Sequence, residues 1–193
     1  MTARWVVDEV AEARDIEILW QPISLLFKNE PAEDSAYFAP VQKTHNMLRV
    51  MESVRAAEGD APIFKLYWEL ASRIHNDGDR DFDIADVLES VGLDRSYATA
   101  LTDEAWDAEI RTRMDAGLAL VGTDVGTPII AWERSDGKNI GIFGPVISRA
   151  PKGEDALKLW DGMMLMGDVD GFWELKKSRT DPPEFGDRPA IRH

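Results

Sequence analysis

The sequence predicts an α/β fold that is interrupted by a large all-helical insertion and lacks its first central strand. Three observations predict it. A short β-favouring segment lies near the amino end, at residues 16–23. Helical periodicity then dominates residues 35–121, and a hairpin pattern follows at residues 128–146. Apolar residues make up 44% of the 193 residues, and 7 residues are Trp, which indicates a folded chain with a sizeable core.

The first predicted elements are a helix and a strand. Residues 3–14 place three valines and Ala13 on one face at helical spacing, with acidic residues elsewhere. Residues 16–23, IEILWQPI, are short and rich in β-favouring side chains, so they are predicted to form a strand. Residues 24–34 are predicted to form a polar loop.

The insertion is predicted to contain only helices. Apolar residues recur at helical spacing in three segments, residues 62–76, 83–92 and 103–122. In the middle segment, Asp83 is a predicted N-cap and Gly92 a predicted C-terminal stop.

The carboxyl-terminal third begins with a predicted hairpin. The apolar runs at residues 128–134 and 140–146 flank an Asp-Gly pair, which favours a tight turn. A helical stretch is predicted for residues 153–177, with a break near Gly167. The tail, residues 179–193, is rich in proline and charge and is predicted to be loose.

The order of elements is therefore helix, strand, helical block, hairpin, helix. A thioredoxin-like fold has this order when its opening strand is removed, and a DsbA-type protein adds a helical insertion in the middle. The predicted domains are a thioredoxin-like domain at residues 1–34 and 122–178, the helical insertion at residues 35–121, and the loose tail.

Charge and composition exclude several functions. The formal net charge of -14 predicts repulsion from nucleic acid and from anionic membranes, so neither is an expected partner. The absence of cysteine excludes disulfides, thiolate metal sites and thiol catalysis by these residues themselves. The amino end does not read as a signal peptide, and we expect a cytoplasmic protein.

Five segments, taken in order, resemble one family: residues 14–30, 73–79, 121–130, 143–162 and 172–185. They are similar to DsbA-family thioredoxin-fold oxidoreductases, closest to the actinobacterial mycothiol-dependent nitroreductases. The resemblance covers nearly the whole chain. It implies an oxidoreductase with mycothiol, a low-molecular-weight thiol, as co-substrate and no tightly bound cofactor. It also implies a small electrophilic or disulfide substrate, and it allows a homodimer.

The resemblance implies roles for individual residues. Thr127 and Pro128 match a loop in which a cis-proline faces the catalytic cysteine. The backbone of the residue before that proline can pair with a thiol substrate. Asn29 and Tyr37 match polar residues that line the substrate pocket, and His45 is expected to face the same pocket.

This chain departs from the family at its amino end. The family begins with a strand and a Cys-Pro-Trp-Cys motif at the start of the first helix, and Trp5 matches the aromatic residue soon after the second cysteine. We therefore expect the family cysteines to precede Met1, so that no residue of this chain is itself catalytic and the chain alone is inactive. A truncated or misassigned start is favoured over a shortened natural protein, because the other family segments are intact. The missing strand would pair with residues 16–23 and 128–134, leaving both unpaired.

Two alternatives stay open. Glutathione-dependent isomerases of the 2-hydroxychromene-2-carboxylate type share the fold and use serine in place of the first cysteine. The other alternative is a non-catalytic binding module that keeps a pocket without redox chemistry.

Other candidate sites are weaker. Asp77, Asp79 and Asp81 match the first calcium ligands of an EF-hand loop, but Phe82 and Leu88 replace the required Gly and Glu, so no metal site is predicted. The spacing of the three histidines implies no carboxylate partner, so no catalytic histidine is predicted. No G-x-S-x-G motif surrounds either of the serines that lie nearest the family-like segments, so no catalytic serine is predicted.

Overall fold

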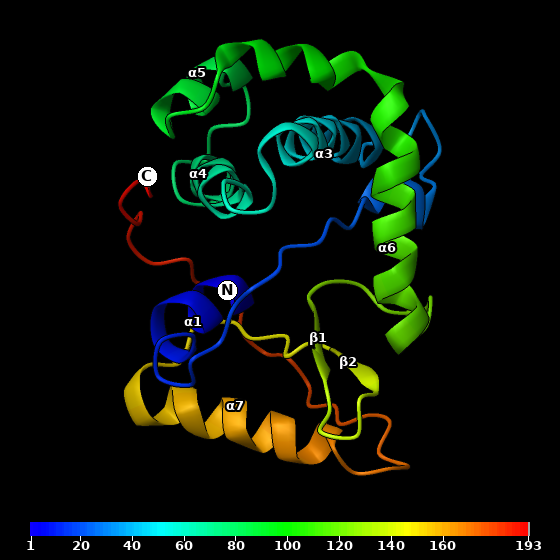
Figure 1. Ribbon diagram of the computed structural model, residues 1–193, viewed down its shortest axis with the longest axis vertical. Helices are drawn as coiled ribbons and strands as arrows, with labels where there is room; N and C mark the ends of the chain where they lie inside the picture. Colours follow the sequence, from blue (N-terminus) through cyan, green and yellow to red (C-terminus); the bar gives the residue numbers. More distant parts are fainter. Residues whose placement is uncertain (193) are drawn as a thin grey trace. The chain divides into compact units, whose positions relative to one another are not determined.

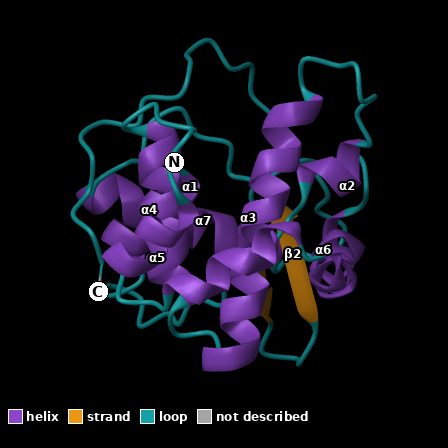
Figure 2. Ribbon diagram, turned by 90° about the horizontal axis from the view of Figure 1, so that it is seen from above, coloured by secondary structure: helices purple, strands orange, loops and turns teal. Residues whose placement is uncertain are grey.

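The computed structural model describes residues 1–192; His193, at the end of the predicted tail, lies outside the described residues. The protein is a mixed α/β protein in which helices predominate, and the described strands form one two-stranded antiparallel sheet (Figures 1 and 2). The chain divides into two compact units. The first unit comprises Met1–Ile18 and Ala116–Phe185, and the second comprises Leu19–Asp115 and Gly186–His193.

The first unit opens with the predicted amino-terminal helix. Helix α1, Thr2–Trp5, continues directly as a π-helical turn, η1, over Val6–Val10, and then ends in a turn. The helix is therefore shorter than predicted. The core of the unit consists of residues from this helix and from α7, Gly153–Gly167, namely Trp5, Val6, Val10, Ala156, Trp160 and Met163.

The predicted hairpin is confirmed. Strand β1, Ile129–Glu133, pairs with β2, Asn139–Phe143, in a register that places Ile130 opposite Ile142. Both of these isoleucines pack against the core of the first unit. In the turn, Gly137 takes a φ of 81°, a left-handed conformation that a glycine adopts without strain.

Helix α7, Gly153–Gly167, confirms the first part of the predicted carboxyl-terminal helix. The prediction that helical structure resumes up to residue 177 is wrong, because residues 172–177 have no regular structure. Gly171, with a φ of 88°, takes a left-handed conformation that interrupts a right-handed helix.

The predicted strand at residues 16–23 does not form. This segment is a loop that leads from η1 to the next helix, α2, Leu25–Asn29 (Figure 1). Its burial nevertheless alternates as in a strand: Ile16 and Ile18 pack on the core of the first unit, whereas Glu17 is exposed. Side-chain periodicity alone does not make a strand, because the backbone also needs a hydrogen-bonded partner, and no described residue provides one.

The second unit is built from helices around its own core. In chain order they are α2 Leu25–Asn29, α3 Phe38–Glu58, α4 Ile63–His75, α5 Ile84–Ser90, the 3-10 turns η2 Arg95–Thr102 and η3 Glu104–Trp106, and α6 Asp107–Val121, whose last residues belong to the first unit. The three predicted helices are thus confirmed. The Asp83 side chain accepts a hydrogen bond from the Ala85 N–H at 2.8 Å, and Gly92 has a φ of 72°, as expected of a cap and a stop.

Helix α2 corrects the prediction of a loop at residues 24–34. The Ser24 hydroxyl caps this helix by accepting a hydrogen bond from the Phe27 N–H at 3.1 Å. Glu30 ends it in a left-handed conformation, with a φ of 42°. A single turn of five residues is too short to show helical periodicity in the sequence.

The carboxyl-terminal tail has no regular secondary structure over residues 179–192, but it makes specific contacts. Arg188 donates to Glu69 Oε1 and to Asp77 Oδ2, both at 2.8 Å, and Asn76 donates to the Gly186 carbonyl at 3.1 Å. The end of the tail is therefore attached to α4 of the second unit. No helix among residues 1–192 combines the length and apolarity that crossing a membrane requires.

Candidate functional site

The residues singled out in the sequence are divided between the two units. The first unit contains Trp5, Thr127 and Pro128, and the second contains Asn29, Tyr37 and His45.

The loop before β1 presents open backbone groups. The Thr127–Pro128 peptide bond is cis, as the resemblance implies. The Pro128 carbonyl accepts a hydrogen bond from the Gly144 N–H at 2.8 Å, which ties it to the end of the hairpin. Thr127 is exposed, and its own N–H and C=O bond to no described residue. Thr127 is therefore free to hydrogen-bond a ligand through its backbone.

A second proline, which the sequence did not single out, lies next to this loop. The Gly144–Pro145 bond is also cis, and Gly144 takes a φ of 105°. The buried Thr2 hydroxyl donates to the Pro145 carbonyl at 2.8 Å. Two hydrogen bonds therefore connect the start of α1, through residues 144 and 145, to Pro128.

The structure places Trp5 in the core of the first unit. Its side chain is fully buried, its indole N–H donates to the Ala156 carbonyl at 3.1 Å, and its ring meets that of Trp160 edge-on with centroids 5.9 Å apart. Trp5 thereby anchors α1 to α7.

In the second unit, His45 lies at the centre of a buried polar chain. Its Nδ1 lies 2.9 Å from the Ser24 hydroxyl and its Nε2 lies 3.1 Å from Asp107 Oδ1. Arg49 donates to both carboxylate oxygens of Asp107, at 2.6 and 2.8 Å. Because the Ser24 oxygen already accepts from the Phe27 N–H, its own hydrogen is available for Nδ1, and the imidazole proton is assigned to Nε2.

Burial and neighbouring charges set the protonation states of His45 and Asp107. Burial lowers the pKa of His45, and the neighbouring Asp107 carboxylate only partly opposes that shift. Burial also raises the pKa of Asp107, but the hydrogen bonds and charges of Arg49 and His45 outweigh it, so that the net shift is downward. Near neutral pH, the His45 imidazole is therefore uncharged and lies beside the ion pair of Asp107 and Arg49.

The serine, histidine and aspartate of this chain do not form a nucleophilic site. The Ser24 side chain is only 1% exposed, and its oxygen is occupied as a helix cap. Asp107 is already neutralised by Arg49. What the arrangement does is structural: it joins the starts of α2 and α6 to the side of α3.

Sequence reasoning missed Ser24, Arg49 and Asp107 as partners of His45. His45 and Asp107 are 62 positions apart, so no local spacing could have related them. The predicted pocket residues Asn29 and Tyr37 are both exposed, at the end of α2 and just before α3. His45, in contrast, is only 1% exposed and lies against the ring of Phe27, with centroids 4.4 Å apart.

Comparison with known families assigns the chain. The sequence model of the family described as "Rv2466c-like: Mycothiol-dependent nitroreductase Rv2466c" matches residues 1–177. The match includes all six residues singled out above and most of both units. The family is one of oxidoreductases, and its description names mycothiol as the thiol on which they depend. The chain belongs to the Rv2466c-like family of mycothiol-dependent nitroreductases.

Proposed function

We propose that this chain acts in the cytoplasm as a mycothiol-dependent reductase of small electrophilic or disulfide substrates, with a DsbA-like thioredoxin fold. The family match over residues 1–177 is the observation that carries the proposal. The Thr127 N–H and C=O, which bond to no described residue, support the proposal because they can hydrogen-bond the amide groups of a thiol co-substrate.

The chemistry requires two thiols. Reducing a nitro group to a nitroso group and water consumes two electrons and two protons, and two thiols supply both when they join in a disulfide. In disulfide exchange, a thiolate attacks one sulfur, the old S–S bond breaks, and a second thiol resolves the mixed disulfide. The 193 residues contain no cysteine, so each sulfur comes from mycothiol or from protein outside these residues.

The residues of this chain would bind and orient the thiol and the substrate. The Thr127 N–H can donate to a carbonyl of the thiol, and its C=O can accept from an amide. The pairing pattern of the hairpin directs the N–H and C=O groups of Ile129 and Ala131 away from β2, which extends the same open edge. The exposed Asn29 amide and Tyr37 hydroxyl would hold the polar end of the substrate.

Two forms of the protein test this proposal. One is the 193-residue chain, and the other carries the family segment with Cys-Pro-Trp-Cys joined ahead of residue 1. The loss of a nitroaromatic probe is followed at increasing mycothiol concentration. We expect saturable, mycothiol-dependent turnover from the extended form, and none above the rate of mycothiol alone from the 193-residue chain.

Matched variants of the extended form complete the test. Replacing both cysteines with serine should abolish turnover without changing the thermal midpoint. Asn29→Ala and Tyr37→Phe should raise KM for the probe severalfold while kcat changes less. A folded extended form without mycothiol-dependent turnover on nitro or disulfide probes would refute the proposal.

A further inference from the structure

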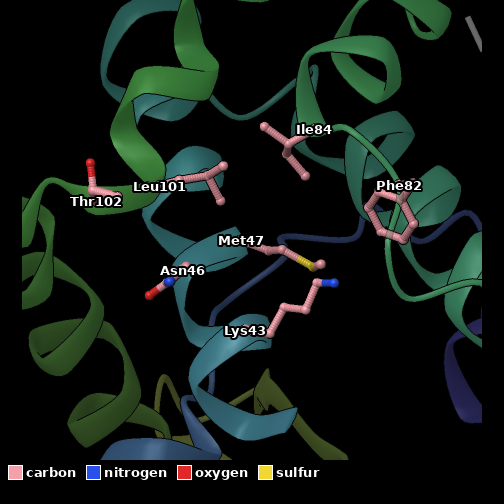
Figure 3. A pocket seen from close by; sticks show the side chains of 7 residues that line it. All are labelled: Lys43, Asn46, Met47, Phe82, Ile84, Leu101 and Thr102. Atoms are coloured by element: carbon pink, nitrogen blue, oxygen red, sulfur yellow. The ribbon is translucent and has the colours of Figure 1, made fainter. Parts of the chain in front are cut away.

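The second unit contains a cavity of about 260 Å³, and none of its lining residues belongs to the first unit, which contains Thr127. Its seven lining residues come from α3, from the segment that leads into α5, and from the end of η2: Lys43, Asn46, Met47, Phe82, Ile84, Leu101 and Thr102 (Figure 3). A dry protein cavity of about 150 Å³ already accepts benzene, so this one has room for a one- or two-ring molecule.

Most of the wall is apolar and suited to a flat ring. Met47 and Ile84 are buried, and Leu101 and Phe82 are partly buried around them. A thioether makes favourable contacts with aromatic rings, and Phe82 offers a ring for stacking or edge contact. These side chains favour an aromatic ligand over a strongly hydrated one.

The three polar side chains of the wall, Lys43, Asn46 and Thr102, can each donate a hydrogen bond. Figure 3 shows the Lys43 ammonium extending past Met47 towards Phe82. The Asn46 Oδ1 accepts from Arg49 at 3.5 Å, which leaves the amide NH₂ group with no partner among the described residues. The Thr102 hydroxyl likewise has no described partner. Donors beside a cation select a ligand with acceptor oxygens and negative charge.

Two further cations lie beside the cavity, Arg49 and Arg73, and each is paired with a carboxylate, that of Asp107 and of Glu69 respectively. Arg49 also approaches the carbonyl of Leu101, at 3.5 Å, and the Arg73 guanidinium lies 5.6 Å from the centre of the Phe82 ring. Lys43 is already paired with a carboxylate, Asp81 Oδ1, at 2.8 Å. Because the Asp81 side chain is 98% exposed, this ion pair is weak and a better-placed carboxylate can replace it.

We propose that this cavity binds a one- or two-ring aromatic carboxylate. The ring lies against Met47, Ile84 and Leu101, and the carboxylate takes the place of Asp81 on Lys43. The site is independent of the proposed reductase chemistry, since it uses none of the residues assigned to mycothiol.

The test is titration of the 193-residue chain with 2-naphthoate by calorimetry, with 2-naphthalenemethanol as the uncharged analogue. We expect saturable one-to-one binding of the acid, about tenfold tighter than that of the alcohol. Lys43→Met should remove that difference by weakening the acid alone. Asp81→Asn should strengthen binding of the acid by about twofold to fivefold, because it frees Lys43 from its exposed partner.

Two controls make the result specific. Lys176→Met makes the same change of net charge in the first unit and should leave both affinities unchanged. Leu101→Trp should fill the cavity and abolish binding of both molecules. If the Leu101→Trp protein is not cooperatively folded, Met47→Phe is used to fill the cavity instead. The proposal is overturned if the acid does not saturate at millimolar concentration, if acid and alcohol bind equally, or if Lys43→Met weakens the acid no more than Lys176→Met.

Discussion

Replacing His45 with leucine tests the buried polar chain of the second unit. The side chain is 1% exposed and bonds to Ser24 and Asp107 at 2.9 and 3.1 Å. Leucine leaves the Ser24 hydroxyl without its acceptor, at a cost of about 1–3 kcal/mol, and removes the ring contact with Phe27, at a further ~1 kcal/mol. We therefore expect His45→Leu to lower the free energy of unfolding by about 3 kcal/mol at pH 7.5.

The pH dependence of this effect has a definite sign. Burial lowers the pKa of His45 in the folded protein below the ordinary value of 6.5, which applies to the unfolded chain. At a pH between the folded and the unfolded pKa, the imidazole is therefore protonated in the unfolded chain but not in the folded protein. The stability of the wild type must fall as the pH drops below about 6.5, by up to ~1.4 kcal/mol per pH unit until the folded pKa is reached. The leucine variant lacks this loss. The difference between the two proteins therefore narrows as the pH falls.

Urea unfolding followed by circular dichroism at pH 7.5, 6.5 and 5.5 measures this difference. Burial also lowers the pKa of His75, but that residue is present in both proteins and its contribution cancels. Ser24→Ala is the matched control, because it removes the hydroxyl and keeps the titrating imidazole. A difference between wild type and His45→Leu that stays constant from pH 7.5 to 5.5 would refute the assignment of a neutral, buried imidazole.

Three further predictions concern the first unit, each checked by thermal and urea unfolding. Trp5→Phe removes the indole bond to the Ala156 carbonyl and should cost about 1–2 kcal/mol, and an unchanged midpoint would contradict the role of Trp5 as an anchor. Gly167→Ala should cost about 1–3 kcal/mol, because its Cβ would lie 2.6 Å from ring atoms of Trp132; a stabilised variant would show that the indole moves aside freely. Gly162→Ala lies in the same helix, and its added Cβ would meet no atom within 4 Å beyond the neighbouring residues and backbone of that helix; it should instead stabilise by about 0.5–1 kcal/mol, and a loss of stability there would argue against the geometry of α7.

Local patterns predicted most of the secondary structure. The helices at residues 63–75 and 107–121 and the hairpin at residues 129–143 follow directly from apolar periodicity and turn residues. Asp83 was recognisable as an N-cap because it is a residue with a side-chain acceptor that stands directly before a segment with apolar residues at helical spacing. These features depend on residues within a few positions of one another, which a sequence displays openly.

The features that sequence analysis missed depend on distant partners. Residues 16–23 alternate correctly for a strand, but a strand also needs a neighbouring backbone, and no described residue supplies it. The bond between His45 and Asp107 joins positions 62 residues apart on two helices. The conversion of α1 to a π-helix after Trp5 leaves no recognised mark in the residue pattern.

The open side of β1 restricts how two copies of this hairpin could associate. If β1 of one copy paired in parallel and in register with β1 of another, the two Glu133 carboxylates would lie side by side. Repulsion between these like charges disfavours an extended sheet built in this way. Copies running in opposite directions and centred on Ala131 would instead set Glu133 opposite Ile129. One acidic side chain at the end of a five-residue strand thus disfavours fibre-like growth, yet permits a closed, two-fold pair.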